Sequence, residues 1–360
     1  MSKEISLNKI SDLTKKLSND KHVKILRNAM IRTDSNELSM NWDEYRKIDH
    51  SFSNVITGEM PATNQKSSGR CWGFAGLNLF RVYLGRKHNL KNFEFSQSYF
   101  MFWDKLEKAN YFLESIIDTI SEKSDSRIVM HLLSYPLEDG GQWDMWVNLI
   151  NKYGVLPQTE MSESFSTSQS TQMNKMISNK LREYASELRN FHKNGESLEK
   201  LRELKDKMIE EVFKMLSMHI GTPPQTFDWQ VRNKDKKFLR FENLTPQSFF
   251  KEHVALNLED YVCLINCPMK DKEYNKVYTV EHLGNVIEGR NIRYLNVTSK
   301  EMKDASIKSI KDDNPVWFGC DVGKYFHRNL GVMDTNLFDY NSFYDSEFKM
   351  NKAQRLEYGQ

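Results

Sequence analysis

Cys71 stands at the point in this sequence where a loop gives way to a helix. The loop reads NQKSSGR, and from Trp72 onward apolar residues recur at three- and four-residue steps, which predicts a largely buried helix that begins at Cys71. A cysteine attacks a carbonyl group as the thiolate, and the unpaired amide N–H groups of a helix N-terminus favour that form. The pattern therefore predicts a cysteine nucleophile for acyl transfer.

The residues around Cys71 supply further groups that such chemistry needs. Gln65 precedes the cysteine by six residues, and its side-chain amide can reach the oxyanion of a tetrahedral intermediate if the loop folds back. The backbone N–H of Cys71 would be the second donor, and Gly69 allows the backbone to approach a substrate closely. A buried structural thiol is the alternative for Cys71. The neighbouring Gln, Gly and Trp favour the nucleophile.

Composition restricts the partners and the compartment. The 360 residues hold 51 Lys and Arg against 49 Asp and Glu, so a net charge of +2 gives no general attraction to nucleic acid or anionic membranes. The N-terminus lacks the apolar core of a secretory signal, and no later stretch is apolar enough to span a bilayer. Four cysteines are too few for a disulfide framework. We expect a cytoplasmic protein with reduced thiols and no membrane partner.

Hydrophobic periodicity and turn residues predict the remaining elements. The expected elements are polar helices up to about residue 60, a helix over 95–120, an amphipathic helix that follows Gly140 and Gly141 and ends at Gly154, two long solvated helices over 170–217, a loop over 222–229, short strands between 261 and 297, and a buried strand over 313–322.

The string NQKSSGRCWGFAGLN resembles the bleomycin hydrolase and bacterial aminopeptidase C group of papain-like cysteine peptidases. Ser68 stands where secreted members of that clan have a disulfide cysteine, which agrees with reduced thiols. Further segments resemble the same group in the same order: EDGGQWDMWVNLINKYGVLP, MSESFS, GTPPQTFDW, VYTVEHLGNVIEGR, PVWFGCDVGK, GVMDTNLFDY and MNKAQRLEYG. The resemblance covers essentially the whole chain.

The resemblance implies an α+β papain-like fold with a large insertion and an incomplete β-rich lobe. The domains expected from it are an N-terminal extension (1–60), a helical catalytic lobe (61–165), an inserted helical and strand region (166–311) and the start of the β-rich lobe (312–360). It also implies that Gly140 and Gly141 lie along the substrate backbone, that peptides and small amides are the substrates, and that the assembly is a homohexamer. No metal or organic cofactor is implied.

Two catalytic residues that the resemblance leads one to expect are not identifiable. In the group, the general-base histidine follows soon after the segment that resembles MNKAQRLEYG, and the orienting asparagine lies in a later Asn-Ser-Trp string, which is absent here. His192 and His219 lie downstream of Cys71 but belong to a charged helical stretch and to the edge of a Pro-Pro loop, so neither is expected to serve. We therefore expect a C-terminally truncated, inactive or nearly inactive copy of an aminopeptidase.

Three alternatives accompany this prediction. Cys263 and Cys267 with His253 or His282 could form a zinc site, but four converging ligands are required and the spacing is weak evidence; these cysteines and Cys320 are expected to be buried in apolar strands. The Lys-rich helices over 175–214 could contact nucleic acid, although interleaved Glu and Asp favour a solvated face. Finally, a non-catalytic binding or scaffold protein on the same fold would explain the missing histidine and asparagine.

Overall fold

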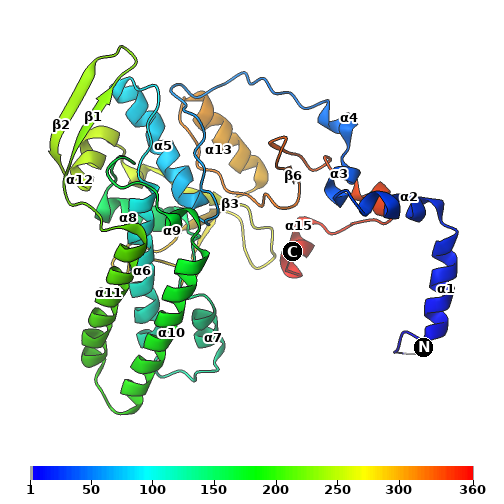
Figure 1. Cartoon of the computed structure of the whole chain (residues 1–360), viewed down its shortest axis with the longest axis horizontal. Helices are drawn as coiled ribbons and strands as arrows, with labels where there is room; N and C mark the ends of the chain where they lie inside the picture. The colour runs from blue at the N-terminus through cyan, green and yellow to red at the C-terminus, as the bar shows by residue number, and fades with distance from the viewer. Residues whose placement is uncertain (1–2, 360) are drawn as a thin grey trace. The chain divides into compact units, whose positions relative to one another are not determined.

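A computed structural model describes residues 3–359 of the chain, which divide into two units (Figure 1). The smaller unit joins the residues up to Ser53 with those from Cys320 onward, and the larger unit runs from Asn54 to Gly319. Each unit has its own hydrophobic cluster, and the larger cluster surrounds the helix that begins at Cys71. The four domains expected from sequence remain a prediction.

The expected helical start of the chain is confirmed as far as Tyr45, whereas residues 46–60, which were also expected to be helical, are irregular. The first helices of the smaller unit begin where Ser6, Asp20 and Asp34 accept hydrogen bonds from backbone amides, which satisfies donors that a helix start leaves unpaired. The elements of this unit are α1 (Leu7–Ser18), α2 (Lys21–Met30), α3 (Ser35–Ser39), α4 (Trp42–Tyr45), β6 (Phe326–His327), β7 (Val332–Met333), α14 (Tyr340–Tyr344) and α15 (Lys352–Glu357).

The larger unit is built around α5 (Cys71–His88), α6 (Gln97–Asp118) and α8 (Trp143–Tyr153). Helix α5 is buried over most of its surface, as its weakly amphipathic sequence predicts, and contacts both α6 and α8. Phe80 of α5 lies 4.7 Å, between ring centres, from Trp146 of α8. The middle of α5 is thereby packed in an aromatic core.

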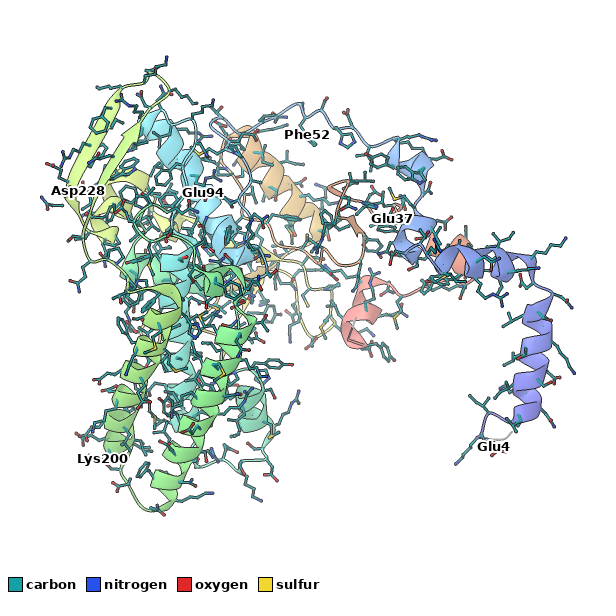
Figure 2. The ribbon with its side chains drawn as sticks, in the orientation of Figure 1. Glu4, Glu37, Phe52, Glu94, Lys200 and Asp228 are labelled. Atoms are coloured by element: carbon teal, nitrogen blue, oxygen red, sulfur yellow. The ribbon has the colours of Figure 1, made fainter. Side chains whose placement is uncertain are left out.

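The two long helices expected over 170–217 are α10 (Thr171–Lys193) and α11 (Leu198–Ile220), which pack on each other and on α6 (Figures 1 and 2). They are not solvated all round, because each buries an apolar stripe that includes Leu181 and Leu188 on α10 and Val212 and Leu216 on α11. The short helices α7 (Arg127–Ser134) and α9 (Phe165–Ser168) complete this helical part.

Strands follow the helical part, as expected between 261 and 297. A parallel pair, β3 (Cys263–Ile265) and β5 (Tyr294–Asn296), is extended by β4 (Lys276–Tyr278), which runs antiparallel to β5. An antiparallel hairpin precedes them, formed by β1 (Phe227–Arg232) and β2 (Phe238–Leu244). The prediction of a loop over 222–229 is therefore wrong for its last residues, because Phe227 and Trp229 already belong to β1. The intervening helices are α12 (Pro246–Phe249), the π-helix η1 (Phe250–Val254), the 3₁₀ helix η2 (Leu258–Asp260) and α13 (Ser299–Lys311).

The buried strand expected over 313–322 is wrong. This segment is irregular, and Val316 and Phe318 are 39% and 66% exposed. A strand needs a neighbouring ladder of backbone partners, and among residues 3–359 no strand pairs with it. Cys320, expected to be buried there, is exposed, whereas Cys263 and Cys267 are half-buried.

Candidate active site

Cys71 is the first residue of α5, and its side chain is exposed. The capping position, Arg70, makes no side-chain hydrogen bond to the helix N-terminus, so the thiol lies at the positive end of an uncapped helix dipole. Trp72 follows and is buried, 4.9 Å from Phe100 between ring centres. Cys71 is therefore exposed on a first helical turn that is anchored in the core by the buried Trp72.

An ion pair between Arg70 and Glu163 fixes the residue that precedes Cys71. The guanidinium of Arg70 donates two hydrogen bonds to the carboxylate of Glu163, at 2.9 and 2.7 Å, and the Arg70 side chain is only 2% exposed. Burial acts to raise the pKa of Glu163, but the hydrogen bonds and charge of Arg70 outweigh it and hold that pKa below its usual value. The fork-shaped pair fixes both the position and the orientation of residue 70.

The loop that carries Gln65 is fixed by short-range hydrogen bonds. Asn64 Oδ1 accepts from the Lys66 amide at 2.8 Å, which supports the left-handed conformation of Lys66 (φ 55°). The Ser68 hydroxyl donates to the Gln65 carbonyl at 2.7 Å and accepts from Arg70 Nε at 2.9 Å. The backbone of Gln65 is thus tied through Ser68 to the residue before Cys71.

Asp139 joins this loop to the glycine pair. Its carboxylate accepts the Gly69 amide at 3.0 Å, the Ser170 hydroxyl at 2.5 Å and the Asn174 amide at 2.6 Å, and it pairs with Lys105 Nζ at 2.5 Å. Burial acts to raise the pKa of Asp139, and the charge of Lys105 with these hydrogen bonds brings it well below its usual value. A Cβ on Gly69 would lie 2.7 Å from the Cβ of Asp139, which explains why glycine stands there.

The two glycines of the pair have different surroundings. A Cβ on Gly141 would lie 2.6 Å from the indole of Trp72, whereas a Cβ on Gly140 would have no neighbour within 4 Å. Gly141 is therefore required by close packing beside Cys71. Gly140 borders open space, so packing does not require a glycine there.

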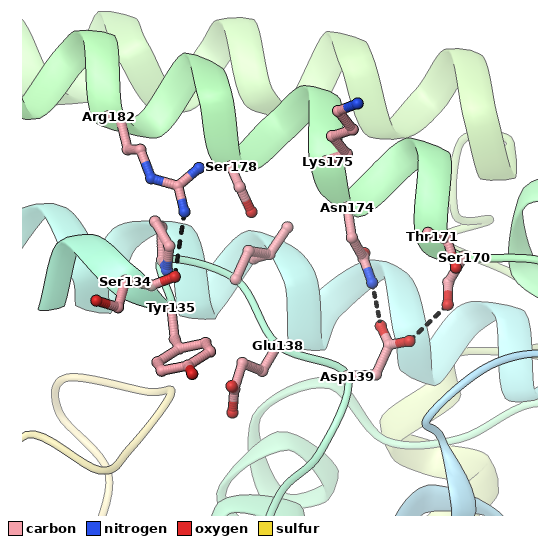
Figure 3. Close-up of a pocket in the computed structure, with 12 residues that line it drawn as sticks. Ser134, Tyr135, Glu138, Asp139, Ser170, Thr171, Asn174, Lys175, Ser178 and Arg182 are labelled. Carbon is pink, nitrogen blue, oxygen red and sulfur yellow. Dashed lines mark hydrogen bonds between the residues drawn. The ribbon is translucent and has the colours of Figure 1, made fainter. Parts of the chain in front are cut away.

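A surface depression of about 410 Å³ lies on the α10 side of Asp139. Figure 3 shows residues that line it. Ser170 and Asn174 reach the Asp139 carboxylate from α10 and the turn before it, and Arg182 donates to the Ser134 carbonyl. Cys71 does not line this depression. The depression is lined by Asp139, which precedes the glycine pair, and by the residues that hold its carboxylate.

The Peptidase C1-like family model matches residues 4–360 of the chain. The chain belongs to this family. It is 41% identical to human bleomycin hydrolase over 98% of the chain and 79% of that protein, and 42% identical to aminopeptidase C of Listeria innocua over 99% of the chain and 80% of that protein. The chain is 40% identical in sequence to PepW from Lactobacillus rhamnosis HN001. The crystal structure of PepW matches the chain with a TM-score of 0.96, over 100% of the chain and 80% of PepW.

Membership of the Peptidase C1-like family confirms the resemblance to bleomycin hydrolases and aminopeptidases C and the mixed helix and strand fold of papain-like peptidases. The chain is therefore a member of a cysteine peptidase family. Among residues 3–359 no helix is long and apolar enough to cross a membrane, and no group of three His, Cys, Asp or Glu side chains is placed to hold a metal ion.

Within the described chain, no histidine of this Peptidase C1-like protein is hydrogen bonded to Cys71. His192 and His219 lie in the last turns of α10 and α11, in agreement with their expected helix-end positions, and His219 Nδ1 contacts the Ser166 hydroxyl at 2.9 Å. His88 and His253 contact each other, at 3.1 Å between ring nitrogens. Of the other histidines in the larger unit, His131 is exposed, His282 contacts the Ser115 hydroxyl, and His192 is half-buried and, among residues 3–359, makes no hydrogen bond to Cys71.

Sequence reasoning missed Asp139, Glu163 and Lys105 as the supports of this peptidase site. A signal was present for two of them. Asp139 directly precedes the glycine pair, and Lys105 is one of several charged residues inside the otherwise apolar and aromatic run FMFWDKLEKANYF, where a charge requires a partner. Glu163 has no comparable signal, because its partner Arg70 lies 93 positions away.

Proposed function

We propose that this protein is a cysteine aminopeptidase that hydrolyses peptides and small amides from the amino end with Cys71 as nucleophile. The observation that carries the proposal is the exposed Cys71 thiol at the uncapped start of a buried helix, held by the Arg70–Glu163 pair. The names of the human and Listeria relatives, bleomycin hydrolase and aminopeptidase C, support this class of substrate.

The reaction begins when the Cys71 thiolate attacks the scissile carbonyl carbon and a C–S bond forms. The oxyanion of the tetrahedral intermediate accepts hydrogen bonds from the Cys71 N–H and from the side-chain amide of Gln65. In the described chain Gln65 Oε1 is buried and has no hydrogen-bond donor, so the loop does not hold the amide group by its oxygen. The C–N bond then breaks as a solvent water protonates the amine, and a second water hydrolyses the thioester, which releases the carboxylic acid and returns the Cys71 thiolate.

Gly140 and Gly141 are proposed to bind the substrate backbone beside the nucleophile. Gly141 packs against Trp72, the residue next to Cys71, and this packing supports the proposal. The open space at Gly140 supports the same role.

The 360 residues alone are proposed to be inactive or nearly so, because the described chain places neither a histidine nor an orienting asparagine at Cys71. The test is hydrolysis of aminoacyl-aminomethylcoumarin, with and without free imidazole as an external base. We expect almost no turnover without imidazole and a measurable increase with it, which Cys71→Ala abolishes. Rapid turnover without imidazole would refute the proposed inactivity.

A non-catalytic binding or scaffold protein on the same fold is the second candidate, and the same lack of a histidine at Cys71 favours it. A scaffold would bind peptides without acylation of Cys71, so imidazole would leave hydrolysis at the level of Cys71→Ala. A covalent thioester with an activated aminoacyl ester, detected by mass spectrometry, would exclude this candidate.

We further propose a homohexamer in the cytoplasm that takes no nucleic-acid partner. Free cysteines support a reducing compartment. Sedimentation of the purified chain would test the hexamer, and fractionation of its native cells would test the compartment.

A further inference from the structure

The loop before Gly141 is fixed through its carbonyl groups. The Glu138 carbonyl accepts from Lys105 Nζ at 2.7 Å, the Asp139 carbonyl accepts from the indole N–H of Trp72 at 2.6 Å, and the Gly140 carbonyl accepts from Lys108 Nζ at 2.6 Å. Three successive carbonyls are therefore each bound by a buried side chain, and the last of them belongs to the peptide bond between Gly140 and Gly141.

All three N–H donors of the Lys108 ammonium group have acceptors in this arrangement. An ammonium group has three N–H donors, and those of Lys108 go to Asp104 Oδ2 at 2.8 Å, to the Glu138 carbonyl at 2.9 Å and to the Gly140 carbonyl. The side chain is 8% exposed, and Nζ lies 5.0 Å from the centre of the Trp72 ring. If the Gly140 carbonyl turned away, the buried ammonium would lose one of its three acceptors.

The orientation of this carbonyl determines where the next N–H group points. In a trans peptide bond the C=O and N–H point in opposite directions, so a Gly140 carbonyl turned toward Lys108 directs the Gly141 N–H away from the interior. Within the described chain the Gly141 N–H has no hydrogen-bond acceptor. We propose that Lys108 is a positioning residue, which holds the Gly140–Gly141 peptide bond so that the Gly141 N–H donates to a carbonyl of the bound peptide.

This inference rests on the proposed function, since it takes the glycine pair as the substrate contact. Without Lys108 the peptide bond between two glycines can turn, and a carbonyl oxygen would then face the carbonyl of the ligand. The loss of one well-placed backbone hydrogen bond is expected to weaken peptide binding about tenfold.

The sequence offers an unusually specific probe. Gly140–Gly141 is the single Gly-Gly sequence among the 16 glycines. Cell-free synthesis with glycine labelled at the carbonyl carbon and the nitrogen therefore gives one carbon–nitrogen correlation, from the Gly140 carbonyl and the Gly141 amide. This signal is recorded for the chain, for Lys108→Met, and for Lys180→Met, a matched control in which a lysine 4.7 Å from the Tyr184 ring is removed far along α10.

Without ligand, both nuclei are expected to shift in Lys108→Met and to stay in place in Lys180→Met. Unchanged positions in Lys108→Met would overturn the proposal. If Asp104, left buried without its partner, prevents folding of Lys108→Met, the double variant Asp104→Asn, Lys108→Met removes the pair together and is measured instead.

The same signal is then followed as the tripeptide Ala-Ala-Phe amide is added, in a Cys71→Ala background that prevents turnover. We expect a saturable shift of the Gly141 amide and a Kd about tenfold higher with Lys108→Met, but not with Lys180→Met. If the Kd in Lys108→Met equals the Kd with Lys108 present, the positioning role of Lys108 is overturned, while the substrate contact of the glycine pair stands. No response to peptide even with Lys108 present would overturn the substrate contact of the glycine pair, and the positioning role with it.

Discussion

The two ends of helix α5 carry the two residue types that a thiol peptidase needs, a cysteine and a histidine, in opposite settings. Cys71 at the start is exposed, and the neighbouring Arg70 and the Asp139 that binds Gly69 are held by ion pairs with Glu163 and Lys105. His88 at the end is half-buried, 3.1 Å from His253, and packs against Trp229 at 5.1 Å and Phe241 at 5.5 Å.

The difference shows why residue types alone do not make an active site. A helix rises about 1.5 Å per residue, so Cys71 and His88 lie about 25 Å apart and cannot exchange a proton. The start of α5 is organised to leave one reactive group accessible. Its end is organised to join the helix to the β1–β2 hairpin and to η1.

The largest effect is expected from Arg70→Met, which removes the cation beneath Cys71. Glu163, whose side chain is 25% exposed, would remain without its partner. The loss of one member of a largely buried pair costs about 3 kcal/mol of unfolding free energy. Urea unfolding monitored by tryptophan fluorescence measures it.

The matched control is Arg202→Met. Arg202 is 51% exposed, and its partner Glu114 keeps Lys205 at 2.6 Å, so the change should stay below about 1 kcal/mol. Equal losses for the two variants would mean that the start of α5 does not depend on the Arg70 pair.

A second comparison uses the glycine pair itself. Gly141→Ala places a methyl group against Trp72 and is expected to destabilise the fold by about 2 kcal/mol. Gly140→Ala meets no neighbour and should change stability by less than about 0.5 kcal/mol. Thermal unfolding of both variants measures the difference, and a reversed order would contradict the packing described at Trp72.

The other end of α5 should respond to pH. Burial, then the charges of His253 and Lys87, lowers the pKa of His88 from 6.5 to about 4. Between these values the unfolded chain binds more protons than the folded one, so the free energy of unfolding falls as the pH drops from about 6.5 toward 4. The partial exposure of His88 reduces the effect to about 1 kcal/mol.

Urea midpoints at pH 7 and pH 4.5 measure this loss. His88→Phe should make it smaller, because the titrating imidazole is gone, whereas His131→Asn in the exposed part of α7 should leave it as it is. A loss that is unchanged in His88→Phe would show that other groups cause it.

Local pattern was enough to predict the start of the site. The recurrence of apolar residues after Trp72 predicted the start of α5 at Cys71, and the glycine pair before an amphipathic stretch predicted α8. These features depend on neighbours within one or two turns. The spacing of Gln65 before Cys71 predicted its oxyanion role, and family resemblance added the expected functions of Gly140 and Gly141.

Features that depend on distant partners were not predictable in the same way. The pair of Arg70 with Glu163 and the contact of Asp139 with Gly69 join segments 93 and 70 positions apart. The segment over 313–322 has a strand-like sequence, but no strand pairs with it among residues 3–359, and a single sequence does not contain that information.

The smallest change in stability is expected from Cys71→Ser. The side chain is exposed and the first turn is fixed by its neighbours Arg70 and Trp72, so the free energy of unfolding should change by less than about 0.5 kcal/mol. A buried structural thiol would instead cost more than 1 kcal/mol when replaced by a hydroxyl. Alkylation by a peptidyl chloromethyl ketone at this position should disappear in the variant, while Cys320, which is also exposed, continues to react with iodoacetamide. A large loss of stability would show that Cys71 is a structural thiol. A small loss would show that the accessible thiol at the start of α5 does not stabilise the fold, as expected for a residue that serves as a nucleophile.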